Sequence, residues 1–101
     1  DEVFDGMRVV FVAPETDGTG AEFELLEPLD GGAVADYIER RGEGVQHVAF
    51  EVDGIESELE RLDDAGVRLI DDEPRDGARG KRVAFVHPSE TNGVLLELCE
   101  K

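Results

Sequence analysis

The sequence predicts an α+β domain built on a β-α-β-β-β module, and the order and number of its segments lead to this prediction. From residue 45 onward, segments with strand and helix patterns follow one another as strand, helix, strand, strand and strand. Residues 1–44 contain two strand-like segments and a helix, which match the same module without its opening strand and helix. The chain has 101 residues, so one domain is expected. We therefore interpret residues 1–44 as the remnant of a first module plus a linker helix, and residues 45–101 as a complete second module.

The first part of the chain contains two predicted strands and one predicted helix. Met7–Ala13 is rich in Val and Phe and reads as a strand closed by Pro14, and residues 15–21 read as a turn. Glu22–Leu26 is a second strand that ends before Pro28. After a glycine-rich break, a short helix is predicted over residues 33–41. The residues expected on one side of this helix are Val34, Tyr37, Ile38 and Arg41.

The second part begins with an alternating strand over Val45–Val52. One face of this strand is expected to carry Gln46, Val48, Phe50 and Val52, and the other Val45, His47, Ala49 and Glu51. Asp53 precedes Glu56 by three residues, which predicts a capping-box start for a helix that ends near Gly66. Its buried side is expected to contain Ile55, Leu59 and Leu62.

Three further strands complete the second part. They are expected at Val67–Ile70, Arg82–His87 and Val94–Cys99. A polar loop over residues 71–80 separates the first two, and a turn through Pro88, Asn92 and Gly93 joins the last two.

Acidic residues dominate the composition. There are 26 Asp and Glu residues against 10 Lys and Arg residues, a net charge of −16. A surface of this sign repels nucleic acid and anionic lipid, so neither is an expected partner. The acids are spread along the chain and the only lysines are Lys81 and Lys101. This composition is typical of proteins from salt-saturated (halophilic) cytoplasms, where salt screens self-repulsion; an ordinary acidic domain is the alternative.

Further features favour a cytoplasmic location. No apolar run is long enough to span a membrane, and residues 1–5 lack the basic and apolar regions of a signal peptide. Cys99 is the only cysteine, so no intramolecular disulfide can form and a reducing compartment fits.

Three ionisable residues stand inside otherwise apolar strands, namely Glu24, His47 and Glu97. Taken singly, a strand Glu is usually a solvated residue and a lone His a hydrogen-bonded packing residue. Together they lie on three different strands, and a sheet curled into a half-barrel would bring them to its concave face. One imidazole and two carboxylates suit a divalent first-row metal, so the pattern permits a metal site.

The sequence also resembles the methylmalonyl-CoA epimerases of the vicinal-oxygen-chelate (glyoxalase–bleomycin resistance–dioxygenase) superfamily. The segments that carry the resemblance are RRGEGVQHVAFEV, GVRLI, DEPR, GKRVAF, HP and GVLLEL, in order and spacing, and they extend over nearly the whole chain. The resemblance implies the glyoxalase-like fold, a curled mixed sheet with helices on its convex face, and a homodimer. It also implies a divalent metal such as cobalt, manganese or zinc, and an acyl-CoA substrate.

Residue roles carry over from the resemblance. His47 matches a histidine ligand, Glu97 the glutamate ligand of the last strand, and Glu24, in ELLEP, a third ligand. The remaining family ligand is a histidine on an opening strand, and the chain is expected to begin after that strand, so that this chain alone is expected to be weak or inactive. His87 matches a histidine that lies in a turn of the family fold and does not bind the metal. Val9 occupies a position where some members have an acid/base Glu, and Glu2 is too distant in sequence from any matched position to be nominated.

The implied reaction is epimerisation of methylmalonyl-CoA by removal and return of the proton alpha to the thioester, with Glu97 in or beside the proton path. The phosphates of CoA need positive charge, and the densest basic cluster consists of Arg75, Arg79, Lys81 and Arg82. Ordinary loop charge explains this cluster equally well. Three alternatives to the epimerase remain: a glyoxalase-type isomerase, a non-catalytic binding protein of the same fold, and a structural remnant whose sheet edges pair with another chain.

Overall fold

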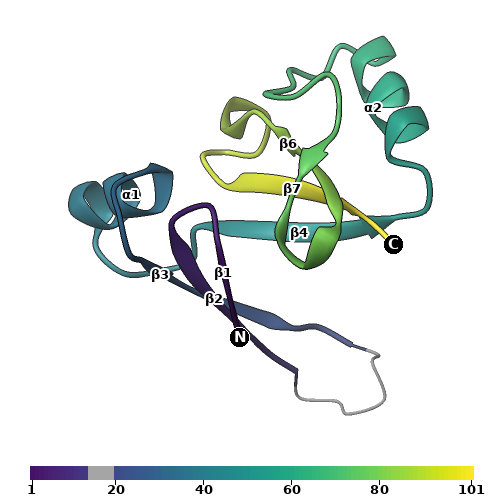
Figure 1. Ribbon diagram of the computed structural model, residues 1–101. Helices are drawn as coiled ribbons and strands as arrows, with labels where there is room; N and C mark the ends of the chain where they lie inside the picture. Colours follow the sequence, from purple (N-terminus) through teal and green to yellow (C-terminus); the bar gives the residue numbers. More distant parts are fainter. Residues whose placement is uncertain (14–19) are drawn as a thin grey trace. The chain divides into compact units, whose positions relative to one another are not determined.

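The computed structural model describes residues 1–13 and 20–101. Pro14 and most of the predicted turn over residues 15–21 lie outside the described residues. The chain divides into two compact units, Asp1–Gly44 and Val45–Lys101, and each has its own sheet and its own helix (Figure 1). The predicted α+β class is confirmed. No helix among the described residues is long and apolar enough to cross a membrane.

The first unit contains an antiparallel sheet in the order β1-β2-β3. The strands are β1 (Glu2–Phe4), β2 (Met7–Val12) and β3 (Phe23–Pro28). The sequence predicted β2 and most of β3 but missed β1. A tight hairpin joins β1 to β2 through Asp5 and Gly6, whose φ angles are 51° and 74°. An Asp-Gly pair with positive φ at both positions is the preferred two-residue hairpin turn, so the missed strand had a signal in the sequence.

Cross-strand pairing assigns the residues of this sheet to two faces. Glu2 pairs with Val9, Val9 with Leu26, and Phe11 with Glu24. These residues therefore share one face with Phe4, Met7 and Pro28. This face is the more buried one, and Val9 is only 1% exposed. The opposite face carries Val3, Arg8, Val10, Val12, Phe23, Leu25 and Glu27. Several of its apolar residues are open to solvent, including Val3 at 70% exposure.

Helix α1 (Ala33–Arg41) has the predicted bounds. Its Val34 is buried and Tyr37 and Ile38 are half-buried, whereas Arg41 is exposed. The helix ends at Gly42, whose φ of 76° leaves the helical region while its amide donates to the Ile38 carbonyl at 2.7 Å. A residue with a side chain would be strained in this conformation, so the glycine defines the helix end.

The second unit contains a mixed sheet in the order β4-β7-β6-β5. Its strands are β4 (His47–Val52), β5 (Arg75–Asp76), β6 (Arg82–Val86) and β7 (Leu95–Glu100). The pairing of β4 with β7 is parallel, and the other pairings are antiparallel. The parallel pair joins the first and last strands of the unit, which places residues far apart in sequence next to one another.

The prediction of a strand at Val67–Ile70 is wrong. Only a single bridge forms there, between Leu69 and Val86. The Asp71 carboxylate accepts the Phe85 amide at 2.9 Å, so a side chain takes the position in the ladder that a continuing strand would use. The second strand of the module is instead the short β5, which lies with a 3-10 turn (Ala78–Gly80) inside the segment predicted as a polar loop.

Helix α2 (Ile55–Asp64) begins differently from the prediction. Gly54, not Asp53, is the N-cap, and no side chain of the helix caps it. The Glu56 carboxylate binds Arg82 at 2.5 and 2.9 Å and does not cap the helix. The cap comes from β7, where a Glu100 carboxylate oxygen accepts the Ile55 amide at 3.2 Å. The predicted capping box is therefore replaced by a carboxylate that is distant in sequence.

The end of α2 and its buried side follow the prediction. Gly66 has a φ of 83° and donates to the Asp63 carbonyl, and Val67 donates to the Leu62 carbonyl, which together form a Schellman motif. The core of the unit consists of Ile55, Leu59, Ala84 and Leu98, with Leu62 among the partly buried residues packed against it. This core lies between α2 and one face of the sheet, so the other face of the sheet is available to the residues that alternate with it.

Candidate metal-ligand pair

His47 and Glu97 are the sequence-predicted site residues that the structure brings together within one unit. His47 begins β4, and Glu97 lies in the middle of β7, opposite Ala49 of β4. His47 Nε2 and Glu97 Oε1 are 3.6 Å apart, and their side chains are only 13% and 16% exposed. Both side chains are mostly buried, so little water screens the charge of the carboxylate from the imidazole.

Strand alternation explains why these two side chains share a face. Leu96 and Leu98 of β7 point toward the α2 core, so Glu97 between them points the other way. Val52 of β4 packs against the same core, and His47 lies on the opposite face by the same alternation. The face of β4 that carries Val48, Phe50 and Val52 is only partly covered, since Val48 and Phe50 are 43% and 55% exposed.

Gln46 orients the His47 ring and was missed by the sequence prediction. Its amide oxygen lies 2.7 Å from His47 Nδ1. An amide oxygen can only accept a hydrogen bond, so Nδ1 is the donor in this arrangement, and in the neutral ring Nε2 then carries the lone pair. The prediction placed Gln46 on the face opposite His47, but β4 starts at His47, so Gln46 is outside the strand and does not follow its alternation. An orienting acceptor on the second ring nitrogen is typical of histidines that bind metals.

The separation of the pair fits two ligands of one metal ion. Ligand atoms that each lie about 2.1 Å from a metal are about 3.0 Å apart at a right angle and about 3.6 Å apart near 120°. The observed 3.6 Å therefore falls in the range of neighbouring ligands. Imidazole nitrogen and carboxylate oxygen together suit zinc, manganese, cobalt and similar divalent ions. Within the described residues, no group of three His, Cys, Asp or Glu side chains comes together that could hold a metal.

Glu24 lies in the first unit, in the middle of β3 opposite Phe11. It is half-buried and belongs to the same face of its sheet as Glu2 and the buried Val9. The neighbouring residues Phe23 and Leu25 point to the other face and are 64% and 55% exposed. Glu24 is thus on the more buried side of its own sheet, which is not where a purely solvating glutamate is expected.

The predicted basic cluster is divided between two faces of the second sheet. Arg75 forms hydrogen bonds with Asp71, and its guanidinium lies 5.1 Å from the centre of the Phe85 ring, on the face that bears Glu97. Arg82 lies on the α2 face and binds both Glu56 and Glu100. Lys81 is half-buried and directly precedes β6. The two arginines are therefore already paired with carboxylates of the chain.

His87 has a local role at the end of β6. Its Nδ1 accepts the Ser89 amide at 3.0 Å and caps the 3-10 helix Pro88–Glu90. This contact accounts for the conformation of the turn without a ligand.

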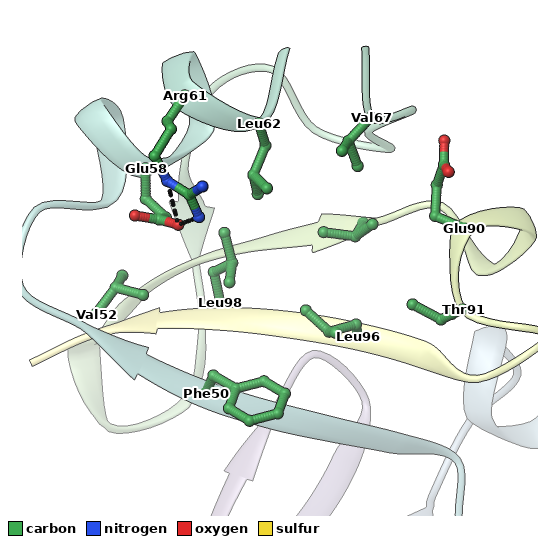
Figure 2. Close-up of a pocket in the computed structure, with 11 residues that line it drawn as sticks. Phe50, Val52, Glu58, Arg61, Leu62, Val67, Glu90, Thr91, Leu96 and Leu98 are labelled. Carbon is green, nitrogen blue, oxygen red and sulfur yellow. Dashed lines mark hydrogen bonds and ion pairs between the residues drawn. The ribbon is translucent and has the colours of Figure 1, made fainter. Parts of the chain in front are cut away.

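A separate hollow of about 380 Å³ lies on the α2 face of the second sheet (Figure 2). Phe50, Leu96 and Leu98 line it from the strands and Leu62 and Val67 from the helix side, while an ion pair between Glu58 and Arg61 lies at its margin. His47 and Glu97 do not line it. The hollow and the ligand pair are therefore on opposite faces of this sheet.

Comparison with known proteins identifies the class. Residues 4–85 match the model of the Glyoxalase/Bleomycin resistance protein/Dioxygenase superfamily, and the chain belongs to this superfamily. Several of its relatives are named as methylmalonyl-CoA epimerases. The chain is 39% identical over 102 residues to the ethylmalonyl-CoA/methylmalonyl-CoA epimerase of Cereibacter sphaeroides, covering 97% of this chain and 72% of the relative.

Solved structures agree with this relationship. Methylmalonyl-CoA epimerase from Mycobacterium tuberculosis superimposes with a TM-score of 0.87 at 35% identity, over 98% of this chain and 67% of that one. A Streptomyces coelicolor methylmalonyl-CoA epimerase variant in complex with 2-nitronate-propionyl-CoA gives a TM-score of 0.86 at 36% identity, over 99% and 73%. The glyoxalase-like fold predicted from the sequence is confirmed. The chain spans 51% to 72% of the length of the curated relatives it matches.

Proposed function

We propose that this protein takes part in the metal-dependent epimerisation of methylmalonyl-CoA, by removing and returning the proton on the carbon between the thioester and the carboxylate. The observation that carries the proposal is the His47–Glu97 pair, 3.6 Å apart and mostly buried, in a chain whose relatives are named as epimerases of this substrate. The resemblance across RRGEGVQHVAFEV and GVLLEL supports it, because both members of the pair lie in these segments.

His47 and Glu97 are proposed as two ligands of a divalent cation, which cobalt, manganese or zinc would satisfy. Gln46 is proposed to keep the Nε2 lone pair of His47 directed to the ion. Glu24 is proposed as a third ligand from the sequence match of ELLEP and from its half-buried position on β3. When bound, the ion would supply positive charge beside the thioester oxygen as the neighbouring carbon loses its proton.

Glu97 is further proposed to lie in the proton path. A carboxylate at this position can accept a proton from the substrate and return it, which is general acid–base catalysis. Among the basic residues, Arg75 and Lys81 are the better candidates to attract an acyl-CoA. Arg75 lies on the face that bears Glu97, whereas Arg82 lies on the other face and forms hydrogen bonds with the carboxylates of Glu56 and Glu100.

The composition supports a physiological setting as part of the same proposal. A net charge of −16 and a single cysteine fit the reducing, salt-rich cytoplasm of a halophilic cell. A homodimer is proposed from the resemblance alone.

Metal binding and turnover together test the proposed function. The protein is freed of metal with a chelator, and cobalt, manganese and zinc are then titrated by calorimetry. Replacement of His47 by Ala should lower metal affinity at least about 100-fold, because removing a second-sphere group alone typically costs 10- to 100-fold. His87→Ala is the matched control, since it removes the other histidine, which caps a turn.

Turnover is followed by NMR with a single epimer of methylmalonyl-CoA, and in parallel with a glutathione hemithioacetal. Epimerisation of the first substrate that depends on metal and on His47 supports the proposal. Turnover of the hemithioacetal alone would identify a glyoxalase-type isomerase. Wild-type protein that binds no divalent metal would contradict the proposal and favour a non-catalytic binding protein.

A further inference from the structure

We propose that Arg75 binds the free carboxylate of the acyl group, and that it thereby selects a carboxylated acyl-CoA over an acyl-CoA without this group. The inference rests on the proposed function, to which it adds the part of the substrate that Arg75 recognises. Two observations carry it. One edge of the Arg75 guanidinium is filled by a carboxylate while the other edge is open, and the residue lies on the face of the sheet that bears Glu97.

Asp71 fills one edge of the Arg75 guanidinium. Nε of Arg75 donates to Asp71 Oδ1 at 3.1 Å, and Nη2 donates to Oδ2 at 3.1 Å. The Asp71 side chain is only 15% exposed, and its carboxylate also accepts the Phe85 amide at 2.9 Å. The guanidinium carbon lies over the Phe85 ring, 5.1 Å from its centre. A carboxylate and an aromatic ring therefore fix the orientation of the guanidinium plane.

The other edge of the Arg75 guanidinium, formed by Nη1 and Nη2, is available to a ligand. Across the residues that the structure describes, every hydrogen bond and ion pair of Arg75 goes to Asp71 through Nε and Nη2. The Arg75 side chain is 53% exposed, so a ligand can reach this edge from solvent. The open edge therefore presents parallel N–H donors in a fixed orientation, which is the arrangement that binds a carboxylate through both of its oxygens.

Arg82, in the same sheet, has carboxylates on both edges of its guanidinium. Its Nε and Nη2 donate to Glu100 at 2.9 Å each, and its Nη1 and Nη2 donate to Glu56 at 2.5 and 2.9 Å. Asp71 binds Arg75 through the same two nitrogens that Glu100 uses on Arg82. In the described part of the chain no residue takes the position on Arg75 that Glu56 takes on Arg82. A carboxylate from outside the chain would complete this set of partners.

Strand pairing places Arg75 near the His47–Glu97 pair. Arg75 is the partner of Val83 on β6, and Phe85, two residues further along β6, is the partner of Glu97 on β7. Two strand spacings separate β5 from β7 by about 10 Å, and the Arg75 side chain shortens this gap because it reaches over Phe85. A small acyl group held beside the pair can therefore extend a carboxylate to Arg75. The phosphates of CoA are less suitable partners, since the pantetheine arm separates them from the thioester.

A comparison of two ligands tests the inference. Propionyl-CoA is methylmalonyl-CoA without the free carboxylate, and both ligands have the same CoA phosphates. Their affinities are measured by calorimetry in the presence of cobalt. Arg75→Ala should weaken binding of methylmalonyl-CoA about 10-fold or more, because a hydrogen bond to a charged group contributes at least about this factor. Its affinity for propionyl-CoA should stay within about twofold of wild type.

Two further variants and one further measurement separate recognition of the carboxylate from a general effect of charge or structure. Arg61→Ala is the matched control, since it removes an exposed arginine that is also paired with a carboxylate, that of Glu58, and it should match wild type with both ligands. Arg75→Lys keeps the charge but not the planar fork, so it should recover only part of the lost affinity. Arg75→Ala should leave the affinity for cobalt unchanged.

Several results would overturn the inference. One is an Arg75→Ala protein that binds methylmalonyl-CoA within about twofold of wild type. An equal loss for both ligands would assign Arg75 to the CoA phosphates, and a loss of cobalt affinity would assign it to the metal site. Wild-type protein that binds neither acyl-CoA contradicts the proposed function and this inference with it. Wild-type protein that epimerises methylmalonyl-CoA, together with an Arg75→Ala protein of unchanged affinity, contradicts the inference alone.

Discussion

Replacement of Gly77 by Ala should destabilise the protein through one steric contact. Gly77 lies in the segment between β5 and β6, and its amide donates to the Lys81 carbonyl at 2.8 Å. Its φ of −121° suits any residue, so backbone strain is not the reason. A Cβ at this position would lie 2.8 and 3.0 Å from the two methyl carbons of Val83. Carbon atoms normally approach to about 3.5–4.0 Å.

The magnitude follows from the surroundings of Val83. Val83 is only 6% exposed and β-branched, so it has little freedom to rotate away. Overpacking of this kind costs about 1–3 kcal/mol, and the lower entropy of the unfolded Ala chain returns about 0.4–1 kcal/mol. We therefore expect a net loss of about 1–2 kcal/mol in the free energy of unfolding, or about 4–16 °C in the melting temperature.

Urea unfolding monitored by circular dichroism measures this loss. Gly31→Ala is the matched control, because its Cβ meets no atom within 4 Å and its φ is not positive, so it should be neutral or slightly stabilising. In the double variant with Val83→Ala the penalty of the Gly77 change should largely disappear. A Gly77→Ala protein as stable as wild type would refute the steric reasoning, as would an equal penalty with and without the Val83 methyls.

Two further predictions concern charge. Hydrogen bonds from Arg82 hold the pKa of Glu56 below its ordinary value, so this pair stabilises the folded state above about pH 4.5 and loses its effect as the pH falls through the lowered pKa. The difference in urea midpoint between wild type and Glu56→Gln should therefore be largest near neutral pH and disappear as the pH falls through the lowered pKa of Glu56. Glu60→Gln, which removes an exposed carboxylate of the same helix, is the matched control. The net charge of −16 predicts that potassium chloride raises the melting temperature, because 1 M salt shortens the screening length from about 10 Å to about 3 Å; an unchanged or lower melting temperature in 1 M salt would contradict self-repulsion as a significant cost.

Periodicity predicted the longer elements of the fold well. α1 has the predicted bounds, and the strands β2, β4, β6 and β7 were found within one or two residues of their ends. These segments bury one face, so their apolar residues recur with the period of a helix or a strand. The shorter elements depend on single turns and contacts instead. β1 is defined by the Asp5–Gly6 turn, and at residues 67–70 only Leu69 bridges to Val86, next to the Asp71 carboxylate that accepts the Phe85 amide.

The N-terminus of α2 shows a second limit of local patterns. The motif Asp53–Glu56 looked like a capping box, but Glu56 binds Arg82 and the helix is capped by Glu100. The partner of Glu56 lies 26 residues away and that of Ile55 lies 45 residues away. Such contacts form only in the tertiary structure, and the periodicity of the sequence does not predict them.

For the candidate site, His47 and Glu97 stand out in the sequence as ionisable residues inside apolar strands, and the structure places them on one face of the same sheet. Their distance depends on the parallel register of β4 and β7, which the sequence did not specify. Gln46 escaped prediction because it precedes the strand. The pairing of Glu2 with Val9 depends on the missed hairpin, so the sequence prediction did not place Glu2 in a sheet.

The parallel contact between β4 and β7 also bears on how the chain is made. His47 meets Glu97 only after the ribosome has released nearly all of residues 45–101, because β7 is the last strand. Contacts of such long sequence separation form slowly. An emerging chain therefore has α2 before it has the strand that completes the core around this helix, and its ligand pair forms only when β7 joins the sheet. A nascent polypeptide halted before residue 95 would have no place to hold an ion between these two side chains, so ion capture reports that β7 has been made and has paired with β4.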